Sequence, residues 1–322
     1  MTAAGRRPID LSVKVGPLHL KNPILTASGT FGYGLDFLPF LKLSDLGGFV
    51  TKGLSLHPRR GHAPARTCET PAGMLNAIGL ANIGVDAFLN DKLPELRRHE
   101  TAIIANVFGE TLEEYVAVSR RLNGAAGLAA IELNLSCPNT AKGGIAFGVS
   151  PPVIGEVVGA VRRAAPDQPL IVKLTPNITD ITIAARAAVD AGADILSLVN
   201  TYLGMMIDLD TRRPILDNIV GGLSGPAIRP LALYLVHRVH LEVGAPIIGM
   251  GGIASAGDAL EFMVAGSGAV QIGTANFVDP GGSARIVREI ETWCRRQGIS
   301  AVSDLVGSLR LPGGSTPPPC AT

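Results

Sequence analysis

The chain has 322 residues, a net charge of +1 at neutral pH, and a composition that is 47% hydrophobic but only 4% aromatic. This near-neutral charge, without a long run of lysine or arginine, excludes the electrostatic pattern of proteins that bind nucleic acid or anionic membranes. The 39 glycines among many aliphatic residues favour short buried strands joined by tight turns, so we expect an α/β protein with a small-molecule partner.

The N-terminal region predicts a short hairpin and no export signal. Residues 6–10 read Arg-Arg-Pro-Ile-Asp rather than an apolar stretch, and no apolar run is long enough to cross a bilayer. We therefore expect a cytoplasmic protein. Residues 11–22 alternate around a Gly-Pro turn at 16–17, which predicts a β-hairpin that covers the bottom of the fold.

Eight short aliphatic runs, each bounded by turn residues, predict eight strands. They cover residues 24–28, 48–53, 101–107, 130–136, 170–175, 195–200, 246–250 and 269–273. Helical patterns follow most of them, and this alternation predicts a parallel sheet. Eight units favour a closed (β/α)8 TIM barrel over an open sheet, which would usually carry a G-x-G-x-x-G motif that is absent from this sequence.

Three helices have recognisable boundaries. Ser150 and Pro151 form an N-cap and first-turn pair before aliphatic residues at helical spacing. We expect Thr179 to cap a second helix that ends near Gly192, and a third helix over residues 258–264.

Two connections are too long for ordinary loops: residues 54–82 after the second strand and residues 202–226 after the sixth. In a parallel barrel both leave from the C-terminal ends of the strands, where active sites are built. Residues 311–322 are rich in glycine and proline and predict a disordered tail. We therefore expect a single barrel domain over residues 1–310, followed by this tail.

Polar residues or glycines end all eight predicted strands, and a barrel brings these ends together at its mouth. They are Ser28, Lys52, Asn106, Asn134 with Ser136 and Cys137, Lys173, Asn200 with Thr201, Gly251 with Gly252, and Gly273 with Thr274. A single asparagine at a strand end is explained as readily by turn stabilisation as by function. Polar residues or glycines at all eight strand ends together indicate a binding site. The glycines after the last two strands predict a phosphate site, with tight turns as the alternative explanation.

Lys52 and Lys173 each end an otherwise apolar strand, where a buried ammonium group is costly unless it meets negative charge. A carboxylate substrate, a phosphate or a reduced flavin would supply that charge. The structural alternative is an ion pair, for example between Lys173 and Glu132. A non-redox alternative is a phosphate-binding barrel, an aldolase or isomerase that uses Lys173 to form a Schiff base.

Cys137 follows the fourth strand and precedes a glycine-rich segment at 143–148 that would suit a flexible lid. A lone cysteine is most often a small buried hydrophobe. Here it could act as a general base if positive charge or a closed pocket favours its thiolate. The four cysteines of the chain have no spacing typical of disulfides, zinc or an iron–sulfur cluster, so we expect no metal site.

Six motifs together are specific for one family. They are ASGTFG at 27–32, TKG at 51–53, ETPAGMLNAIGL at 69–80, NLSCPN at 134–139, GGLSGP at 221–226 and GMGGI at 249–253. In these motifs the chain closely resembles the class 1 dihydroorotate dehydrogenases, over about residues 10–305. The resemblance implies an FMN-dependent barrel that oxidises dihydroorotate to orotate in pyrimidine biosynthesis.

The resemblance also implies roles for individual residues. FMN would be held by Ser28, Lys52, Gly53, Asn106, Asn134, Lys173, Val199, Gly225, Gly251, Gly252, Gly273 and Thr274. The substrate would be held by Lys52, Asn76, Ala77, Ile78, Gly79, Leu80, Asn134, Asn200 and Thr201. Cys137 would take the C5 proton while a hydride passes from C6 to flavin N5, and Lys173 would stabilise the negative charge of the reduced flavin.

Residues 28–32 and 139–144 resemble the NAD-linked subtype 1B. In that subtype a separate electron-transfer subunit carries FAD and a [2Fe–2S] cluster, and two such subunits would join a homodimer of barrels in a heterotetramer. The alternatives are a fumarate-linked class 1A enzyme and another pyrimidine-reducing flavin barrel, such as a dihydrouridine synthase. Quinone-linked class 2 enzymes resemble the chain less, because they use serine as the base.

Overall fold

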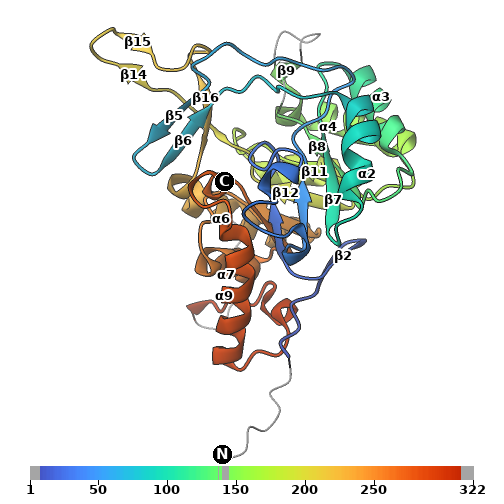
Figure 1. Ribbon diagram of the computed structural model, residues 1–322, viewed down its shortest axis with the longest axis vertical. Helices are drawn as coiled ribbons and strands as arrows, with labels where there is room; N and C mark the ends of the chain where they lie inside the picture. Colours follow the sequence, from blue (N-terminus) through green and yellow to red (C-terminus); the bar gives the residue numbers. More distant parts are fainter. Residues whose placement is uncertain (1–7, 137, 140–144, 313–322) are drawn as a thin grey trace, which may run out of the picture.

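The computed structural model describes residues 8–136, 138–139 and 145–312, and its centre is a closed barrel of eight parallel strands (Figure 1). The strands are β3 (Ile24–Thr26), β4 (Gly48–Val50), β7 (Ala102–Val107), β8 (Ala130–Asn134), β11 (Leu170–Lys173), β12 (Ile195–Leu198), β17 (Ile247–Met250) and β18 (Ala269–Ile272). Each lies within one of the eight predicted strands, and β18 pairs with β3 to close the ring. The predicted (β/α)8 barrel is therefore confirmed.

Helices surround the strands. The longer ones are α3 (Leu112–Leu122), α4 (Pro151–Ala164), α5 (Ile181–Asp190), α6 (Arg229–Val243), α7 (Ala256–Ala265) and α9 (Gly282–Gln297). The short ones are α1 (Val85–Ala87), α2 (Leu93–Leu96) and α8 (Ala275–Val278). Within the described part of the chain, none of the helices combines the length and apolar composition needed to span a bilayer.

The predicted helix boundaries differ from the structure at α5, and α7 extends beyond the predicted 258–264 by two residues at its start and one at its end. The N-cap of α5 is Asp180, whose carboxylate accepts a hydrogen bond from the backbone N–H of Thr182 at 2.9 Å. The prediction of Thr179 as the cap was wrong by one residue, because both residue types cap helices well and the carboxylate here also accepts from the Thr182 hydroxyl. For α4, Ser150 occupies the N-cap position as predicted, although its side chain makes no capping hydrogen bond.

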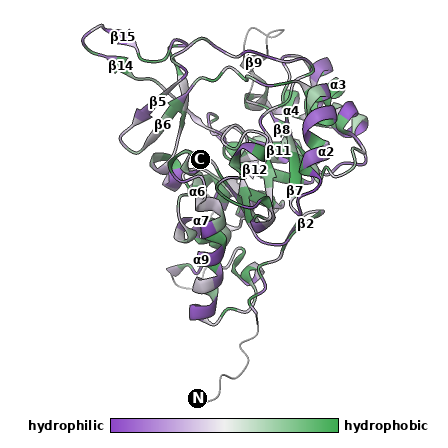
Figure 2. Cartoon of the chain, viewed as in Figure 1, coloured by the Kyte–Doolittle hydropathy of each residue, from purple (hydrophilic) through white to green (hydrophobic). Residues whose placement is uncertain are grey.

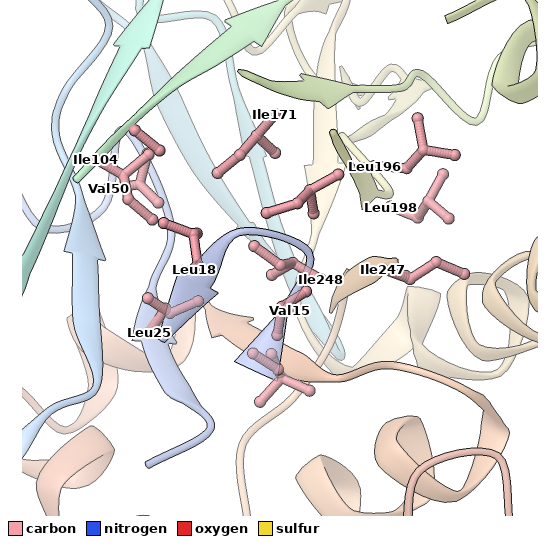
Figure 3. Packing of buried hydrophobic residues seen from close by; sticks show 14 of the residues in the cluster. Val15, Leu18, Leu25, Val50, Ile104, Ile171, Leu196, Leu198, Ile247 and Ile248 are labelled. Atoms are coloured by element: carbon pink, nitrogen blue, oxygen red, sulfur yellow. The ribbon is translucent and has the colours of Figure 1, made fainter. Parts of the chain in front are cut away.

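Apolar side chains from the strands fill the barrel and the layer between strands and helices, while the hydrophilic residues lie on outer helix faces (Figure 2). The hairpin of β1 (Val13–Val15) and β2 (Leu18–Leu20) adds Val15 and Leu18 to this core, close to Leu25 and Ile248 (Figure 3). Its turn residue Gly16 has a φ of +53° and lies against the first residue of β12. The hairpin therefore covers the N-terminal end of the barrel, as predicted.

The two long connections pair with each other. The first contains β5 (Thr67–Thr70) and β6 (Gly73–Asn76), the second contains β13 (Tyr202–Gly204) and β16 (Gly221–Ser224), and the four strands form one antiparallel sheet in the order β13-β16-β6-β5. A hairpin of β14 (Ile207–Asp208) and β15 (Arg213–Pro214) projects from the body (Figure 1). Because both connections leave from C-terminal strand ends, this sheet belongs to the functional end of the barrel.

A capping box begins α7, the helix that follows the glycines after β17. The Ser255 hydroxyl accepts from the backbone N–H of Asp258, and the Asp258 carboxylate accepts from the backbone N–H of Ser255 at 2.9 Å. We expect Ser255→Ala to lower the free energy of unfolding by about 0.5–2 kcal/mol. Urea denaturation would measure the change, with Ser303→Ala as the control because Ser303 is exposed. Equal losses in both variants would show that the cap has no specific role.

Candidate active site

A lysine and a serine meet across the C-terminal end of the barrel. Lys173 is the last residue of β11, and its Nζ donates to the Oγ of Ser28, just beyond β3, at 3.2 Å. These two strands lie four positions apart in the ring of eight, on opposite sides of the barrel. The Lys173 side chain is almost fully buried, and this burial lowers its pKa. The lysine ammonium therefore lies in the interior, under the mouth of the barrel.

A buried carboxylate lies one layer deeper. Glu132, in β8, is fully buried and accepts hydrogen bonds from Asn106 Nδ2 at 2.7 Å and from Gln271 Nε2 at 2.6 Å. Asn106 lies on the neighbouring strand β7, whereas Gln271 lies on β18, on the opposite side of the ring. The Glu132 Oε1 is 4.0 Å from Lys173 Nζ, so the ion pair offered as a structural alternative for this lysine is present.

Two asparagines predicted to bind substrate contact each other. Asn200 Nδ2 donates to Asn134 Oδ1 at 3.2 Å and to the Ser136 hydroxyl at 2.8 Å. Its own Oδ1 accepts from the backbone N–H of Thr201 at 2.8 Å. These hydrogen bonds hold the ends of the β8 and β12 segments together, and they fix both amide groups at the barrel mouth.

The sheet formed by the two long connections holds a third asparagine beside this group. Asn76, the last residue of β6, donates through Nδ2 to the carbonyl oxygen of Gly222 in β16 at 3.1 Å. A Cβ atom added to Gly222 would lie 2.1 Å from the hydroxyl oxygen of Thr201, so Thr201 packs directly on this backbone. Asn76, Thr201, Asn200 and Asn134 therefore form one continuous series of contacts.

Residues 77–80 follow Asn76 and are held by the preceding part of the same connection. The Ala77 N–H donates to the Arg66 carbonyl at 2.7 Å, and the His62 N–H donates to the Ile78 carbonyl at 3.1 Å. Gly79 and Leu80 both have positive φ angles, of +71° and +57°. This segment is a tight, anchored turn rather than a loose loop, which suits a surface that positions a ligand.

Lys52 is half-buried beyond β4, and burial is the main cause of a lowered pKa, with a smaller contribution from the positive charge of Arg66. No hydrogen bond or ion pair joins its ammonium group to any residue that the structure describes. The next residue, Gly53, lies so close to Asn106 that an added Cβ would be 3.1 Å from Asn106 Oδ1. Lys52 thus presents a partly desolvated cation without a protein counterion in the described region.

Glycines form the opposite side of the mouth. Gly252 has a φ of +75°, and an added Cβ would lie 2.8 Å from the Gly225 carbonyl oxygen. The Thr274 hydroxyl donates to the Ser224 hydroxyl at 2.8 Å, which links the end of β18 to the same segment. Val199 is buried below and donates through its backbone N–H to the Met250 carbonyl at 3.0 Å, just before Gly251.

Several backbone N–H groups at these strand ends have no backbone partner among the residues that the structure describes. Those of Gly251, Gly252, Gly273 and Thr274 donate no backbone hydrogen bond to another residue within the described ranges. Buried or half-buried donors of this kind are normally satisfied. A cluster of them at two adjacent strand ends, with no side chain on three of the four residues, fits the oxygens of a phosphate group.

Cys137 lies outside the described residues. Its neighbours Pro138 and Asn139 form β9 (Pro138–Asn139), which pairs antiparallel with β10 (Ile145–Ala146). In the sequence the predicted base directly follows Ser136, whose hydroxyl accepts a hydrogen bond from the Asn200 amide.

Sequence reasoning missed two side chains that support the site. Gln271 is the single polar residue in the apolar strand β18, and this isolated position was the only available signal. Tyr115, in α3, donates from its hydroxyl to the backbone carbonyl of Asn134 at 2.7 Å. Tyr115 thus supports a predicted site residue directly, whereas Gln271 acts through Glu132, the carboxylate beside Lys173.

The described residues thus offer two cations, three amide side chains and a group of free backbone donors around one barrel end. Such a set suits a phosphorylated cofactor together with a small substrate that has amide-like edges. The unpaired N–H groups would suit a phosphate, and the buried Lys173 offers positive charge near the barrel axis.

Comparison with known proteins agrees with this arrangement. The sequence profile of the family described as Dihydroorotate dehydrogenase matches residues 10–293. Over 302 residues the chain is 54% identical to the dihydroorotate dehydrogenase B (NAD(+)), catalytic subunit, of Geotalea daltonii, which covers 94% of this chain and 99% of that protein. It is 53% identical over 306 residues to the protein of the same name from Geobacter sp. strain M21, covering 95% of this chain and 100% of the relative.

Proposed function

The chain belongs to the dihydroorotate dehydrogenase family, and we propose that it is the catalytic subunit of an NAD-linked enzyme that oxidises dihydroorotate to orotate in pyrimidine biosynthesis. The observation that carries this proposal is the joined set of Asn76, Asn134, Asn200 and Thr201 at the barrel mouth. Amide side chains both donate and accept hydrogen bonds, so they match the alternating edge of a pyrimidine ring.

We assign the cofactor FMN to the same end of the barrel, where it would supply the acceptor for the two electrons removed from the substrate. The glycines at 251, 252 and 273, with Thr274 and Gly225, would hold its phosphate through their backbone. Ser28, Lys52, Gly53, Asn106, Asn134, Lys173 and Val199 would line the rest of its site. The unused N–H groups and the small glycine surfaces support this assignment.

We propose that Cys137 removes the substrate proton at C5 while the asparagines orient the ring. Lys52 would neutralise the substrate carboxylate, because its ammonium lacks a counterion among the described residues and is partly desolvated. Asn200 bridges the Asn134 amide and the Ser136 hydroxyl, and would fix the substrate edge next to the cysteine. Residues 76–80 would close over the ring.

We further propose that electrons leave through a separate subunit. The sequence has no dinucleotide-binding motif, and the relatives above are named catalytic subunits of NAD(+)-linked enzymes. The partner would carry FAD and a [2Fe–2S] cluster, and two copies of each chain would form a heterotetramer around a homodimer of barrels.

An acceptor assay tests this function. The protein would be purified with and without its copurifying partner, and dihydroorotate oxidation would be followed with NAD, fumarate and a quinone. We expect NAD to be reduced only by the complex. Turnover of fumarate by the barrel alone would instead assign a class 1A enzyme, and a colourless protein without releasable FMN would contradict the flavin assignment and favour an aldolase or isomerase.

A further inference from the structure

Lys173 and Glu132 form a charged pair buried inside the barrel. The carboxylate is fully buried, and the ammonium is 4% exposed. Glu132 Oε1 lies 4.0 Å from Lys173 Nζ, which is too far for a strong hydrogen bond but close enough for a large electrostatic interaction in a buried site. The lysine's hydrogen bond within the described region goes to the Ser28 hydroxyl.

The carboxylate cannot rotate freely, because neutral amides hold both of its oxygens. Asn106 Nδ2 donates to Oε1 from the neighbouring strand, and Gln271 Nε2 donates to Oε2 from the opposite side of the barrel. The two amides therefore hold the carboxylate at a fixed place beneath Lys173.

Other groups beside the lysine are neutral. The neighbouring strand β12 contributes Ser197 beside it, and the opposite side of the barrel contributes Ser28. Glu132 is the carboxylate that the structure records within 4.0 Å of Lys173 Nζ in the described ranges.

We propose that Glu132 is a positioning residue that keeps Lys173 in its ammonium form at the flavin end of the barrel, with Asn106 and Gln271 orienting its carboxylate. The proposal rests on the assignment of Lys173 to the flavin in the proposed function. It adds that this cation depends on a carboxylate one layer deeper in the barrel, held by two amide side chains. Burial alone lowers the pKa of Lys173, and the charge of Glu132 opposes that change.

The nearly isosteric variant Glu132→Gln tests this by removing the charge while keeping the volume. The chain has only seven lysines, so lysine labelled with 13C at Cε gives a simple NMR spectrum in which Lys173→Arg identifies the resonance. We expect the Lys173 pKa to fall by about one unit or more in Glu132→Gln relative to the wild-type holoenzyme. Glu132→Asp, which retains the charge, should give a smaller decrease.

A second readout is the midpoint potential of bound FMN as a function of pH. If Lys173 loses its proton in Glu132→Gln, electrons entering the flavin bring one additional proton to this lysine. The potential should then lie below the wild-type value and fall more steeply as pH rises. An unchanged Lys173 pKa, with an equal or higher potential of unchanged slope, would overturn the proposal.

If Glu132→Gln does not fold, the comparison of Glu132→Asp with wild type decides, because an identical Lys173 titration in both would also overturn the proposal. Neither readout uses dihydroorotate. A protein that fails to oxidise dihydroorotate, but whose Lys173 pKa falls in Glu132→Gln, would contradict the proposed function and support this inference. A protein that oxidises dihydroorotate, but whose Lys173 pKa is unchanged in Glu132→Gln, would support the proposed function and contradict this inference.

Discussion

Replacing Cys137 with alanine is expected to slow flavin reduction by dihydroorotate by about two to four orders of magnitude, the usual range for loss of a general base. Orotate binding should persist, because the amide groups of Asn134 and Asn200 are held by each other and by Ser136. Anaerobic stopped-flow spectroscopy would measure the reduction rate, and orotate titration of the oxidised flavin would measure binding.

Cys68 provides a matched control for this variant. It is a partly buried free cysteine in β5, where it packs against the small cluster around Leu75. Cys68→Ala should reduce flavin at close to the wild-type rate. A Cys137→Ala enzyme that does the same would remove this cysteine from its proposed role, whereas equal slowing in both variants would indicate a general structural effect.

Adding one methyl group at Gly252 is expected to weaken FMN binding by at least about tenfold. The residue has a φ of +75°, and the left-handed region costs a non-glycine residue about 1–2 kcal/mol. The new Cβ would also lie 2.8 Å from the Gly225 carbonyl oxygen and 2.9 Å from the Arg229 backbone nitrogen. Two of these close neighbours are backbone atoms and the third is the Arg229 Cβ at 2.8 Å, so none can move aside easily. The glycine segment must therefore shift, which would move its N–H groups away from the phosphate.

Gly124→Ala separates the two contributions. Gly124 has a similar φ of +67°, but an added Cβ there meets no atom within 4 Å. The Gly124→Ala variant should lose some stability while retaining the wild-type ratio of FMN to protein. The flavin content after gel filtration and the dissociation constant of FMN would be compared in the two variants. Full retention of FMN by Gly252→Ala would contradict the assignment of the phosphate to these glycines.

The eight barrel strands could be predicted because each is a short apolar run buried on both faces, a pattern typical of parallel sheets covered by helices and not of one-sided antiparallel sheets. The same logic placed polar residues such as Lys173 and Asn134 at the barrel mouth. The ends of the strands were predicted less precisely. The strand β12 ends at Leu198 rather than at the predicted Asn200, because its hydrogen bonds to the neighbouring strands stop before the chain turns into the site.

Contacts between distant segments could not be predicted in the same way. The pairing of β6 with β16 joins residues almost 150 positions apart, and short strands with many glycines carry little information about their partners. The bond between Glu132 and Gln271 depends on closure of the whole ring, which sets opposite strands facing each other. Glu132 was recognised as a partner for Lys173 because its strand was expected to be adjacent.

Anaerobic titration of the purified, flavin-loaded protein with dihydroorotate tests the central claim most directly. We predict that the absorbance of the bound flavin is lost in proportion to added substrate and that orotate is formed in equal amount, without any partner subunit. A flavin-loaded protein whose absorbance stays unchanged at saturating dihydroorotate would contradict the claim that the asparagines and cations at this barrel end bind and oxidise that substrate.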